Sequence, residues 1–300
     1  MPVISEQSES DAQTSYSVTD VIWSGATTAC ESVVIADSAA YGRLLFLDGE
    51  LQSASADEHV YHETLIHPAM ASLSPLKEGH GSVLVVGGGE GATVREVLKW
   101  SAVSRIDWVD IDGELVELCD RHLRWSSGVR QNPRVRYQAA DIRDALPGLG
   151  LYDLIVLDLP DPDGETGWLY SADMWSALAD HLKEGGRIVT HTGPVRPLGR
   201  IGEGLQRVWA AAQASDRFTC SVRAFWHTVI PSFQGSWGFW MTGPDPGPAW
   251  QKAWLPLSRV VDSEQLEHWT HPPALWRFAL LDLDGPIEDS PNYRVRFHGS

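Results

Sequence analysis

The sequence has few cysteines, no long hydrophobic run and a shortage of basic residues. Its three cysteines, Cys30, Cys119 and Cys220, are far apart and odd in number, which argues against a disulfide framework. No apolar run approaches the roughly 20 residues of a membrane span, and the N-terminus lacks the basic-then-apolar pattern of a signal peptide. We therefore expect a cytoplasmic protein without a membrane partner.

The charge balance is strongly acidic. The chain has 300 residues, and 40 acidic side chains outnumber 23 lysines and arginines, which gives a formal net charge of −17. This charge disfavours nucleic acid as a partner, because phosphates are repelled, and it attracts small cations. Acidity also serves solubility alone in many proteins, so composition leaves both interpretations open.

The pattern of apolar runs divides the chain into three segments. Residues 1–18 are rich in Ser, Gln, Glu and Asp and are expected to form a disordered tail. Residues 19–75 carry short alternating runs joined by Asp48-Gly49, which predicts a small antiparallel β-domain, followed by a linking helix from Asp57 to Ser72. Residues 76–300 are predicted to form the larger, catalytic domain.

The larger segment alternates between strand-like and helix-like stretches. Strands are predicted at 83–86, 105–110, 134–138, 153–158, 186–191, 219–226 and 236–241, and helices at 113–124, 171–183 and 200–214. Such alternation predicts an α/β fold with a parallel, doubly wound sheet, which binds ligands beyond the carboxyl ends of its strands. The segment 243–258, rich in Pro and Gly, is expected to be a loop over the core.

The most informative motif follows the first strand of this sheet. Residues 83–86 end in Gly87-Gly88-Gly89-Glu90-Gly91. Glycines at a strand-to-helix turn let the backbone approach a ligand closely, with the helix N-terminus directed at it. A dinucleotide site has the spacing G-x-G-x-x-G and binds a pyrophosphate, whereas Glu90 would repel one. The motif therefore favours a cationic sulfonium nucleoside over NAD.

Acidic residues follow the next three predicted strands. Asp110 lies 19 residues after Gly91, the spacing at which a Rossmann-type acid binds ribose hydroxyls. Asp141 follows the third strand, where an acid can accept from an adenine amino group, and Asp158 ends the fourth, close to Asp161. Any one acid can cap a helix, but acids at four successive strand ends favour a nucleoside site.

Together these motifs resemble the polyamine aminopropyltransferases, the spermidine synthase family, from about Tyr41 to the C-terminus. The segments that carry the resemblance are Gly42–Gln52, Asp57–Glu63, Gly87–Arg95, Val109–Asp112 and Asp158–Pro162. Other details are more similar to the thermospermine synthase and triamine or agmatine branch, namely Glu90, Leu65–Ala69, Asp112–Glu117 and Ile230–Gly238.

The resemblance implies a fold, substrates and an assembly. The fold is a Rossmann-like sheet of the S-adenosylmethionine-dependent methyltransferase type with a small N-terminal antiparallel β-domain. The donor is decarboxylated S-adenosylmethionine, the partner is a small cationic amine, and the assembly is a homodimer or homotetramer. The leaving group is a neutral thioether, so the chemistry needs no metal. His59, His62, Glu63 and His67 are near one another, but their order is not H-E-x-x-H, and no metal site is predicted.

The resemblance also implies roles for individual residues. Asp158 and Tyr61 are the catalytic residues that act on the attacking nitrogen. For the donor, Gln52 and Asp110 hold the ribose, Asp141 and Ile142 the adenine, and Glu90 and His62 the terminal amine; the remaining donor-binding residues are Gly87, Gly88, Gly89 and Ile111. The acceptor-binding residues are Glu31, Asp161, Tyr170, His191, Phe233 and Trp237.

A carboxylate suits this chemistry on physical grounds. An amine with a pKa near 10 is almost wholly protonated at neutral pH, so freeing its lone pair costs about 4 kcal/mol. A carboxylate beside the sulfonium carbon can orient the ammonium and accept its proton.

The chain departs from the family pattern mainly around the acceptor. Glu31 and His191 stand where the family has glutamines. The acceptor therefore remains open between a polyamine such as spermidine, agmatine and putrescine. One alternative is methyl or aminocarboxypropyl transfer from intact S-adenosylmethionine, which Glu90 disfavours because its charge repels the donor's α-carboxylate. A further alternative is a non-catalytic nucleoside- or polyamine-binding homologue, against which the retained Asp158 and Tyr61 argue.

Overall fold

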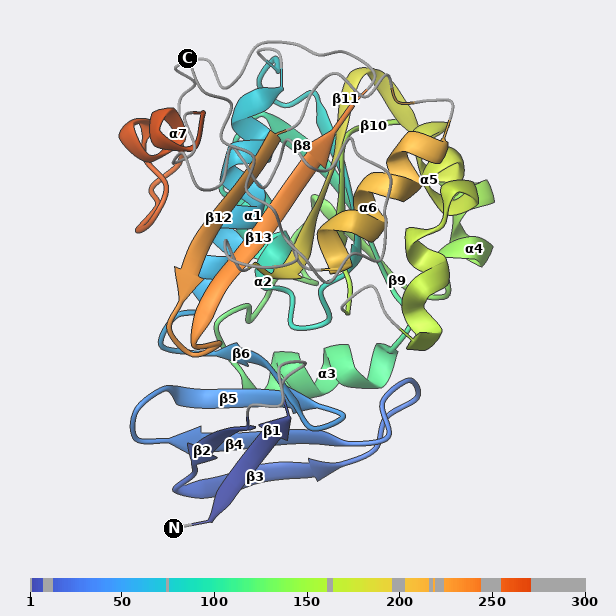
Figure 1. Cartoon of the computed structure of the whole chain (residues 1–300). Coiled ribbons are helices and arrows are strands. Elements are labelled where there is room, and N and C mark those ends of the chain that lie inside the picture. Colours follow the sequence, from blue (N-terminus) through green and yellow to red (C-terminus); the bar gives the residue numbers. More distant parts are fainter. Residues whose placement is uncertain are drawn as a thin grey trace, which may run out of the picture.

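The computed structural model shows a sheet domain with a smaller β-domain at one end (Figure 1). It describes residues 2–7, 13–73, 76–160, 164–195, 203–215, 218, 224–243 and 255–270. None of the helices in these ranges combines the length and the apolar character that crossing a membrane requires. Of the predicted loop at 243–258, only residue 243 and residues 255–258 are described.

The small domain is a four-stranded antiparallel sheet in the order β3-β4-β5-β6. Its strands are β3 (Asp20–Gly25), β4 (Val33–Ser38), β5 (Gly42–Leu47) and β6 (Glu50–Ala54). Asp48 and Gly49 both have positive φ, 49° and 91°, so the Asp-Gly dipeptide forms the tight hairpin turn that the sequence predicts.

The N-terminal residues correct the expectation of a disordered tail. Strands β1 (Val3–Gln7) and β2 (Gln13–Ser17) form an antiparallel pair. Tyr16 is 3% exposed and Val18 is fully buried, both within the apolar cluster of the small domain. Burial of these few apolar side chains outweighs the polar composition on which the expectation rested.

The central sheet has seven strands in the order β12-β13-β11-β10-β7-β8-β9. They are β7 (Gly81–Gly87), β8 (Val103–Asp110), β9 (Val135–Ala139), β10 (Tyr152–Asp158), β11 (Leu182–Pro194), β12 (Ala224–Ile230) and β13 (Gly235–Thr242). The five strands β7 to β11 pair in parallel, but β13 is antiparallel to both β11 and β12. The sheet is therefore mixed and not wholly parallel, because the short turn between β12 and β13 permits only a hairpin.

Helices cover both faces of this sheet (Figure 1). Helices α1 (Glu58–Ser72), α2 (Ala92–Leu98) and α7 (Ser263–Thr270) contribute to the apolar cluster on one face, and α4 (Ile142–Ala145), α5 (Ala172–Ala179) and α6 (Glu203–Ala214) to that on the other. The described residues also form two 3₁₀ segments, Leu146–Gly148 and Gly164–Tyr170. The central strands β7 and β10 are thus buried on both sides, and their carboxyl ends are held rigidly.

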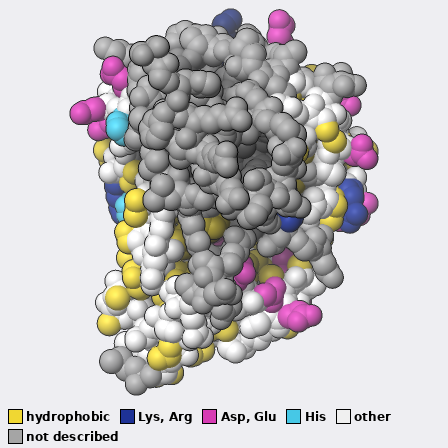
Figure 2. Space-filling model, in the orientation of Figure 1, with side chains coloured by type: hydrophobic (Ala, Val, Ile, Leu, Met, Phe, Trp, Pro, Cys, Tyr) yellow, Lys and Arg dark blue, Asp and Glu magenta, His cyan; other side chains and the backbone are white. Residues whose placement is uncertain are grey.

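Helix α3 (Gly113–His122) joins the two domains. Leu115 and Cys119 of this helix pack with Val33 and Ile35 of the small domain in one buried cluster. Figure 2 shows acidic side chains at the junction between the small domain and the sheet domain. Acidic residues also end two of the parallel strands, Asp110 in β8 and Asp158 in β10.

Candidate active site

The glycine loop after β7 lies directly against the end of β10. The Gly88 amide donates to the Asp158 carbonyl oxygen over 2.7 Å. Gly87 and Gly88 have φ of 79° and 68°, and a Cβ at these positions would lie 2.2 Å from the Asp158 carbonyl oxygen and 2.8 Å from Asp158 Oδ2, respectively. Only glycine fits here, so the loop motif is what brings the backbone beside the Asp158 carboxylate.

Two hydroxyl groups hold the Asp158 carboxylate. Tyr61 of α1 donates its hydroxyl to Oδ1 over 2.8 Å, and Thr93 of α2 donates to Oδ2 over 2.6 Å. Each carboxylate oxygen keeps a further lone pair for a ligand. Tyr61 and Asp158, which the sequence places 97 residues apart, are therefore in direct contact.

A run of alternating charges, which we call the charged chain, begins at Glu90 and continues through His62 and Glu58 to Arg95. His62 Nε2 is 2.7 Å from Glu90 Oε1, and Nδ1 is 2.6 Å from the Glu58 carbonyl oxygen. Arg95 donates to both carboxylate oxygens of Glu58, over 2.9 and 2.8 Å. Because both ring nitrogens of His62 face acceptors, both must donate, and the ring is an imidazolium.

The pKa values of the charged chain agree with this geometry. Burial opposes the charge on His62, but Glu90 and Glu58 outweigh it and raise the pKa of His62 well above its usual value. Burial likewise opposes ionisation of Glu58, but His62 and Arg95 prevail and lower the pKa of Glu58 to about 2. Among the described residues, Glu90 Oε2 is buried without a hydrogen-bond partner, so this oxygen can accept from a ligand cation.

Asp110 and Ile111 lie at the end of β8, beside the same loop. A Cβ on Gly89 would lie 3.3 Å from Asp110 Oδ2, and the Asp112 amide donates to Asp110 Oδ1 over 2.8 Å. Burial, together with the charges of Asp112 and Asp158, raises the pKa of Asp110 to about 7, although the Asp112 amide acts in the opposite direction. Ile111 is apolar yet 55% exposed, which leaves its side chain open to a ring system.

Asp141 and Ile142 are committed to local structure. Asp141 caps α4 by accepting from the Arg143 amide over 2.8 Å, and its oxygens also pair with the Arg143 guanidinium over 3.0 and 2.5 Å. These hydrogen bonds from Arg143 lower the pKa of Asp141. Ile142 is 4% exposed and belongs to the core.

Glu31 and Gln52 come from the small domain. Gln52 is half-buried on β6, and Glu31 is exposed in the loop between β3 and β4. The same loop is fixed to α3, because Asp112 Oδ2 accepts from the Thr27 hydroxyl over 2.5 Å and from the Ala29 amide over 3.1 Å. Since Asp112 also contacts Asp110, this loop adjoins the Asp110 side of the site.

Four rings, which we call the ring cluster, lie beside Asp158: Tyr61, His191, Phe233 and Trp237. The centroid of Tyr61 is 5.9 Å from that of His191 and 6.4 Å from that of Phe233. Trp237 stacks on His191 at 6.2 Å and lies 4.8 Å from Phe233. Aromatic faces attract ammonium groups and aliphatic chains, so the cluster suits an amine.

His191 is fixed in one tautomer. Its Nε2 is 2.5 Å from the Leu159 carbonyl oxygen and must donate, while Nδ1 accepts from the Gly193 amide over 3.2 Å. Both nitrogens thus contact the backbone, and the ring offers a face to the site. Tyr170 is also tied to the backbone, because its hydroxyl donates to the Pro160 carbonyl oxygen over 3.1 Å. Asp161 lies outside the described residues.

The family follows from comparison with known proteins. A model of the spermine/spermidine synthase domain matches residues 58–245, more than half of the chain. The chain belongs to the spermine/spermidine synthase family.

Several polyamine aminopropyltransferases are similar to this family member. One is polyamine aminopropyltransferase 2 of Pseudomonas aeruginosa, 35% identical over 244 residues, or 78% of this chain and 65% of the relative. Another is polyamine aminopropyltransferase 2 of Hyperthermus butylicus, 37% identical over 224 residues, or 73% of this chain and 69% of the relative. The chain therefore spans about two thirds of the length of these curated relatives.

Solved structures show the same fold. A spermidine synthase in complex with the transition-state analogue AdoDATO superposes with a TM-score of 0.78 at 22% identity, covering 93% of this chain and 94% of that structure. The spermidine synthase of Thermotoga maritima gives a TM-score of 0.78 at 20% identity with the same coverage. The expected family and fold class are confirmed, whereas the names of these proteins do not distinguish the thermospermine branch.

Residues of helix α1 take part in two separate sets of contacts. His62 joins the charged chain, while Glu63, His67 and Glu96 lie close enough together to suggest a metal. Lys99 Nζ, however, is 2.6 Å from Glu96 and 3.4 Å from Glu63, so an ammonium already balances these acids. Burial opposes ionisation of Glu96, but His67 and Lys99 lower its pKa to about 2.

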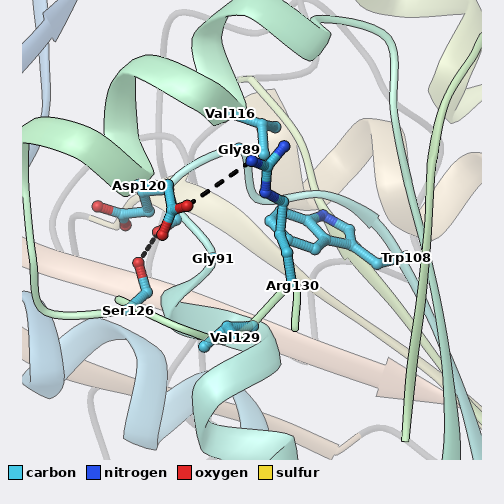
Figure 3. Close-up of a pocket in the computed structure, with 9 residues that line it drawn as sticks. Gly89, Gly91, Trp108, Val116, Asp120, Ser126, Val129 and Arg130 are labelled. Atoms are coloured by element: carbon cyan, nitrogen blue, oxygen red, sulfur yellow. Dashed lines mark hydrogen bonds and ion pairs between the residues drawn. The ribbon is translucent and has the colours of Figure 1, made fainter. Parts of the chain in front are cut away.

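The back of the glycine loop borders a small pocket (Figure 3). Trp108 donates its Nε1 to the Gly87 carbonyl oxygen over 2.8 Å, and the Ser126 hydroxyl donates to the Glu90 carbonyl oxygen. Arg130 points toward Asp120 across the pocket, with 3.7 Å between Nη2 and Oδ2. These contacts fix the loop from behind and so hold Glu90 in place.

Sequence reasoning did not assign site roles to Thr93, Glu58 or Arg95. Glu58 and Arg95 were part of the motifs that carry the family resemblance, but their pairing depends on α1 packing against α2. Thr93 could have been found from its place in the first turn of the helix after the glycine loop.

Proposed function

We propose that this family member transfers the aminopropyl group of decarboxylated S-adenosylmethionine to an amine and releases methylthioadenosine. The observation that carries the proposal is a pair of acids held by two adjacent residues of α1, Tyr61 and His62. Asp158 contacts the Tyr61 hydroxyl, and Glu90 contacts His62, the next residue on α1, and has one buried oxygen without a partner. One acid suits the attacking amine and the other the terminal amine of the donor.

The donor would lie along the carboxyl ends of β7, β8 and β9. Asp110 and Gln52 bind the ribose, Ile111 and the Ile142 backbone pack on the adenine, and Gly87, Gly88 and Gly89 permit close approach. Asp141 accepts from the adenine amino group only if it shares an oxygen with Arg143. Glu90 and His62 bind the terminal ammonium, for which the unpartnered Glu90 oxygen is available.

The transfer itself needs a proton acceptor, and it needs the acceptor nitrogen held in line with the donor carbon next to sulfur. Asp158 takes a proton from the acceptor ammonium, while the Tyr61 hydroxyl holds the carboxylate in position. The freed nitrogen attacks the aminopropyl carbon next to sulfur, so that the N–C bond forms as the C–S bond breaks. The bonding electrons pass to sulfur, which leaves as a neutral thioether. Holding both reactants in line supplies much of the acceleration.

The acceptor that we propose is a polyamine longer than putrescine. The ring cluster offers extended aromatic faces for a methylene chain, and the related proteins are named polyamine aminopropyltransferases. Segment 230–238, which carries Phe233 and Trp237, is similar to the thermospermine branch. Glu31, Tyr170 and Asp161 are proposed to contribute at the acceptor side as well, although the Glu31 loop adjoins Asp112.

Transfer from intact S-adenosylmethionine is less well supported by the site. The donor's α-carboxylate would have to lie near Glu90, whose unpartnered oxygen is an acceptor and repels an anion. A purely binding homologue would not need the two hydroxyls that hold Asp158.

Mass spectrometry of the reaction products tests the proposal. The purified protein is incubated with each donor, decarboxylated or intact, and with putrescine, agmatine, spermidine and thermospermine. We expect methylthioadenosine together with an acceptor that gains one aminopropyl group. S-adenosylhomocysteine, or turnover with the intact donor alone, would assign different chemistry to the site.

We also propose that the protein is a homodimer or homotetramer assembled through its small domain. Gel filtration with light scattering measures the mass directly. A mass equal to that of one 33.1 kDa chain would contradict this proposal.

A further inference from the structure

The turn between β12 and β13 is held by two segments that are distant in sequence. The Tyr16 hydroxyl donates to the Ser232 carbonyl oxygen over 2.9 Å. The Ser232 amide donates to Asp57 Oδ2 over 2.7 Å, and both contacts are buried. Figure 1 shows this turn reaching the small domain. Both backbone groups of Ser232 are thus bound by side chains from elsewhere in the chain.

Each of the two segments is itself rigid. Tyr16 lies on β2, and its ring meets those of Tyr41 and Phe46 edge-on, at 6.1 and 5.5 Å. Asp57 directly precedes α1, the helix that carries Tyr61. The direction of the Tyr16 hydroxyl is therefore set by packing, and the turn is fixed relative to both the small domain and α1.

Phe233, the next residue in the turn, belongs to the ring cluster. Its ring packs against the apolar cluster of the small domain on one side. On the other side it lies 4.8 Å from Trp237 and 6.4 Å from Tyr61. A shift of Ser232 must move Phe233 with respect to Tyr61, because adjacent residues of a tight turn cannot move independently.

We propose that Tyr16 is a positioning residue for the acceptor side of the active site, acting through Ser232 on Phe233. The inference rests on the proposed function of the site around Tyr61 and Asp158. Tyr16 touches no reacting atom. The β1–β2 pair thereby contributes to recognition of the amine, although its polar composition is typical of a disordered tail.

The test compares Tyr16→Phe with Tyr152→Phe. The first variant loses only the hydroxyl, which binds Ser232 and also interacts with the Glu6 carboxylate. The second loses the hydrogen bond from the buried Tyr152 hydroxyl to Asp107 Oδ2, 2.7 Å long, on β10 and β8 away from the ring cluster. We expect Tyr16→Phe to raise the KM of the acceptor amine about three- to tenfold, the usual effect of one buried hydrogen bond, and to leave the donor KM unchanged. Tyr152→Phe should lower Tm and leave both KM values unchanged.

Hydrogen exchange provides a readout that does not require turnover. Tyr16→Phe should speed exchange of the amides in residues 232–234, and Tyr152→Phe should not. If the wild-type protein forms no aminopropyl product, the proposed function fails, yet the exchange rates still test the Tyr16 contact. Unchanged exchange at these amides in Tyr16→Phe would overturn the inference. An unchanged acceptor KM, or equal changes in both KM values, in an active enzyme would overturn it as well.

Discussion

The charged chain and the ring cluster meet at helix α1, where the rings of His62 and Tyr61 lie 5.0 Å apart, and they are built from different kinds of contact. In the charged chain, His62 binds the Glu90 carboxylate and Arg95 binds the Glu58 carboxylate, both at hydrogen-bond distance. In the ring cluster, His191 uses both nitrogens on the backbone and presents a ring face to Trp237. Ion pairs and hydrogen bonds recognise a cation at one defined point, whereas ring faces accept a chain of varying length. The donor should therefore be recognised stringently and the acceptor more permissively.

Asp158 contacts the ring cluster through Tyr61 and helix α2 through Thr93, and its removal should have the largest effect. Asp158→Asn retains the shape and can accept from Tyr61 or from Thr93 through its one amide oxygen, but it cannot take a proton from an ammonium. We expect kcat to fall about 10²- to 10⁴-fold, the usual contribution of a general base. Steady-state kinetics with methylthioadenosine detection measures the change.

A matched control is available on the same strand. Asp153 lies on β10, five residues before Asp158. Its carboxylate accepts hydrogen bonds from Lys183 and Ser82. Asp153→Asn should lower Tm while kcat stays near that of the wild type. Full turnover in Asp158→Asn would show that the carboxylate has no catalytic role.

Glu58→Gln tests whether the charged chain sets donor affinity. The variant weakens the ion pairs to both His62 and Arg95, so we expect the donor KM to rise about tenfold and the acceptor KM to stay within about twofold. An equal rise in both constants would remove the distinction between the two regions.

The same substitution has a consequence for acid stability. The pKa of Glu58 is lowered to about 2 from 4.5, so the ionised carboxylate stabilises the fold above pH 4.5. This contribution is lost as pH falls from 4.5 toward 2. Glu58→Gln should therefore have a lower Tm at neutral pH and a shallower fall of Tm over this interval. A wild-type slope in the variant would argue against the buried ion pairs.

The pH dependence of donor binding sharpens the comparison further. Ribose hydroxyls donate best to ionised Asp110, whose pKa is raised to about 7 by burial and by neighbouring acids. Donor affinity should rise several-fold between about pH 6 and pH 8, and Asp110→Asn should remove this dependence. Calorimetric titration with methylthioadenosine measures it. For the stability of the fold, the sign of the pH dependence is opposite. The pKa of Asp110 is higher in the folded protein than in the unfolded chain, so the protonated carboxyl stabilises the fold fully below the unfolded pKa. This contribution is lost as pH rises through 7.

His191→Gln should have the smallest effect, confined to the acceptor. The glutamine side chain is flexible and polar, whereas the His191 ring is fixed. We therefore expect relative kcat/KM values among amines to change about two- to fivefold. The donor KM should not change, and His191→Phe should keep the wild-type order of amines. Loss of turnover in His191→Phe, with the fold intact by circular dichroism, would identify His191 as a proton carrier instead.

Much of the sheet could be predicted from sequence because its determinants are local. The buried runs of β7 and β10, the glycine loop and the acids at strand ends each follow from a few adjacent residues. The same local signals predict that Asp110 and Asp158 lie at one edge of a sheet. The side chains that contact these acids are harder to predict from the sequence. The Tyr61–Asp158 contact spans 97 residues and was expected only through family resemblance.

What could not be predicted depends on tertiary contacts. The β1–β2 pair is stabilised by burial of Tyr16 and Val18 against the small domain, which polar composition conceals. The place of the β12–β13 hairpin in the sheet depends on the antiparallel pairing of β13 with β11. The tautomer of His191 follows from the Leu159 and Gly193 backbone, and no spacing in the sequence reports those contacts.

The central claim is that Glu90 selects a donor that lacks the α-carboxylate. The measurement is kcat/KM with decarboxylated and with intact S-adenosylmethionine, for the wild type and for Glu90→Gln. Glu90 has one oxygen bound to His62 and one without a partner, so the wild type should strongly prefer the decarboxylated donor. The substitution removes both the attraction for the ammonium and the repulsion of the carboxylate, and should reduce the preference by about tenfold or more. An unchanged preference in Glu90→Gln, or a wild type that favours the intact donor, would contradict this account.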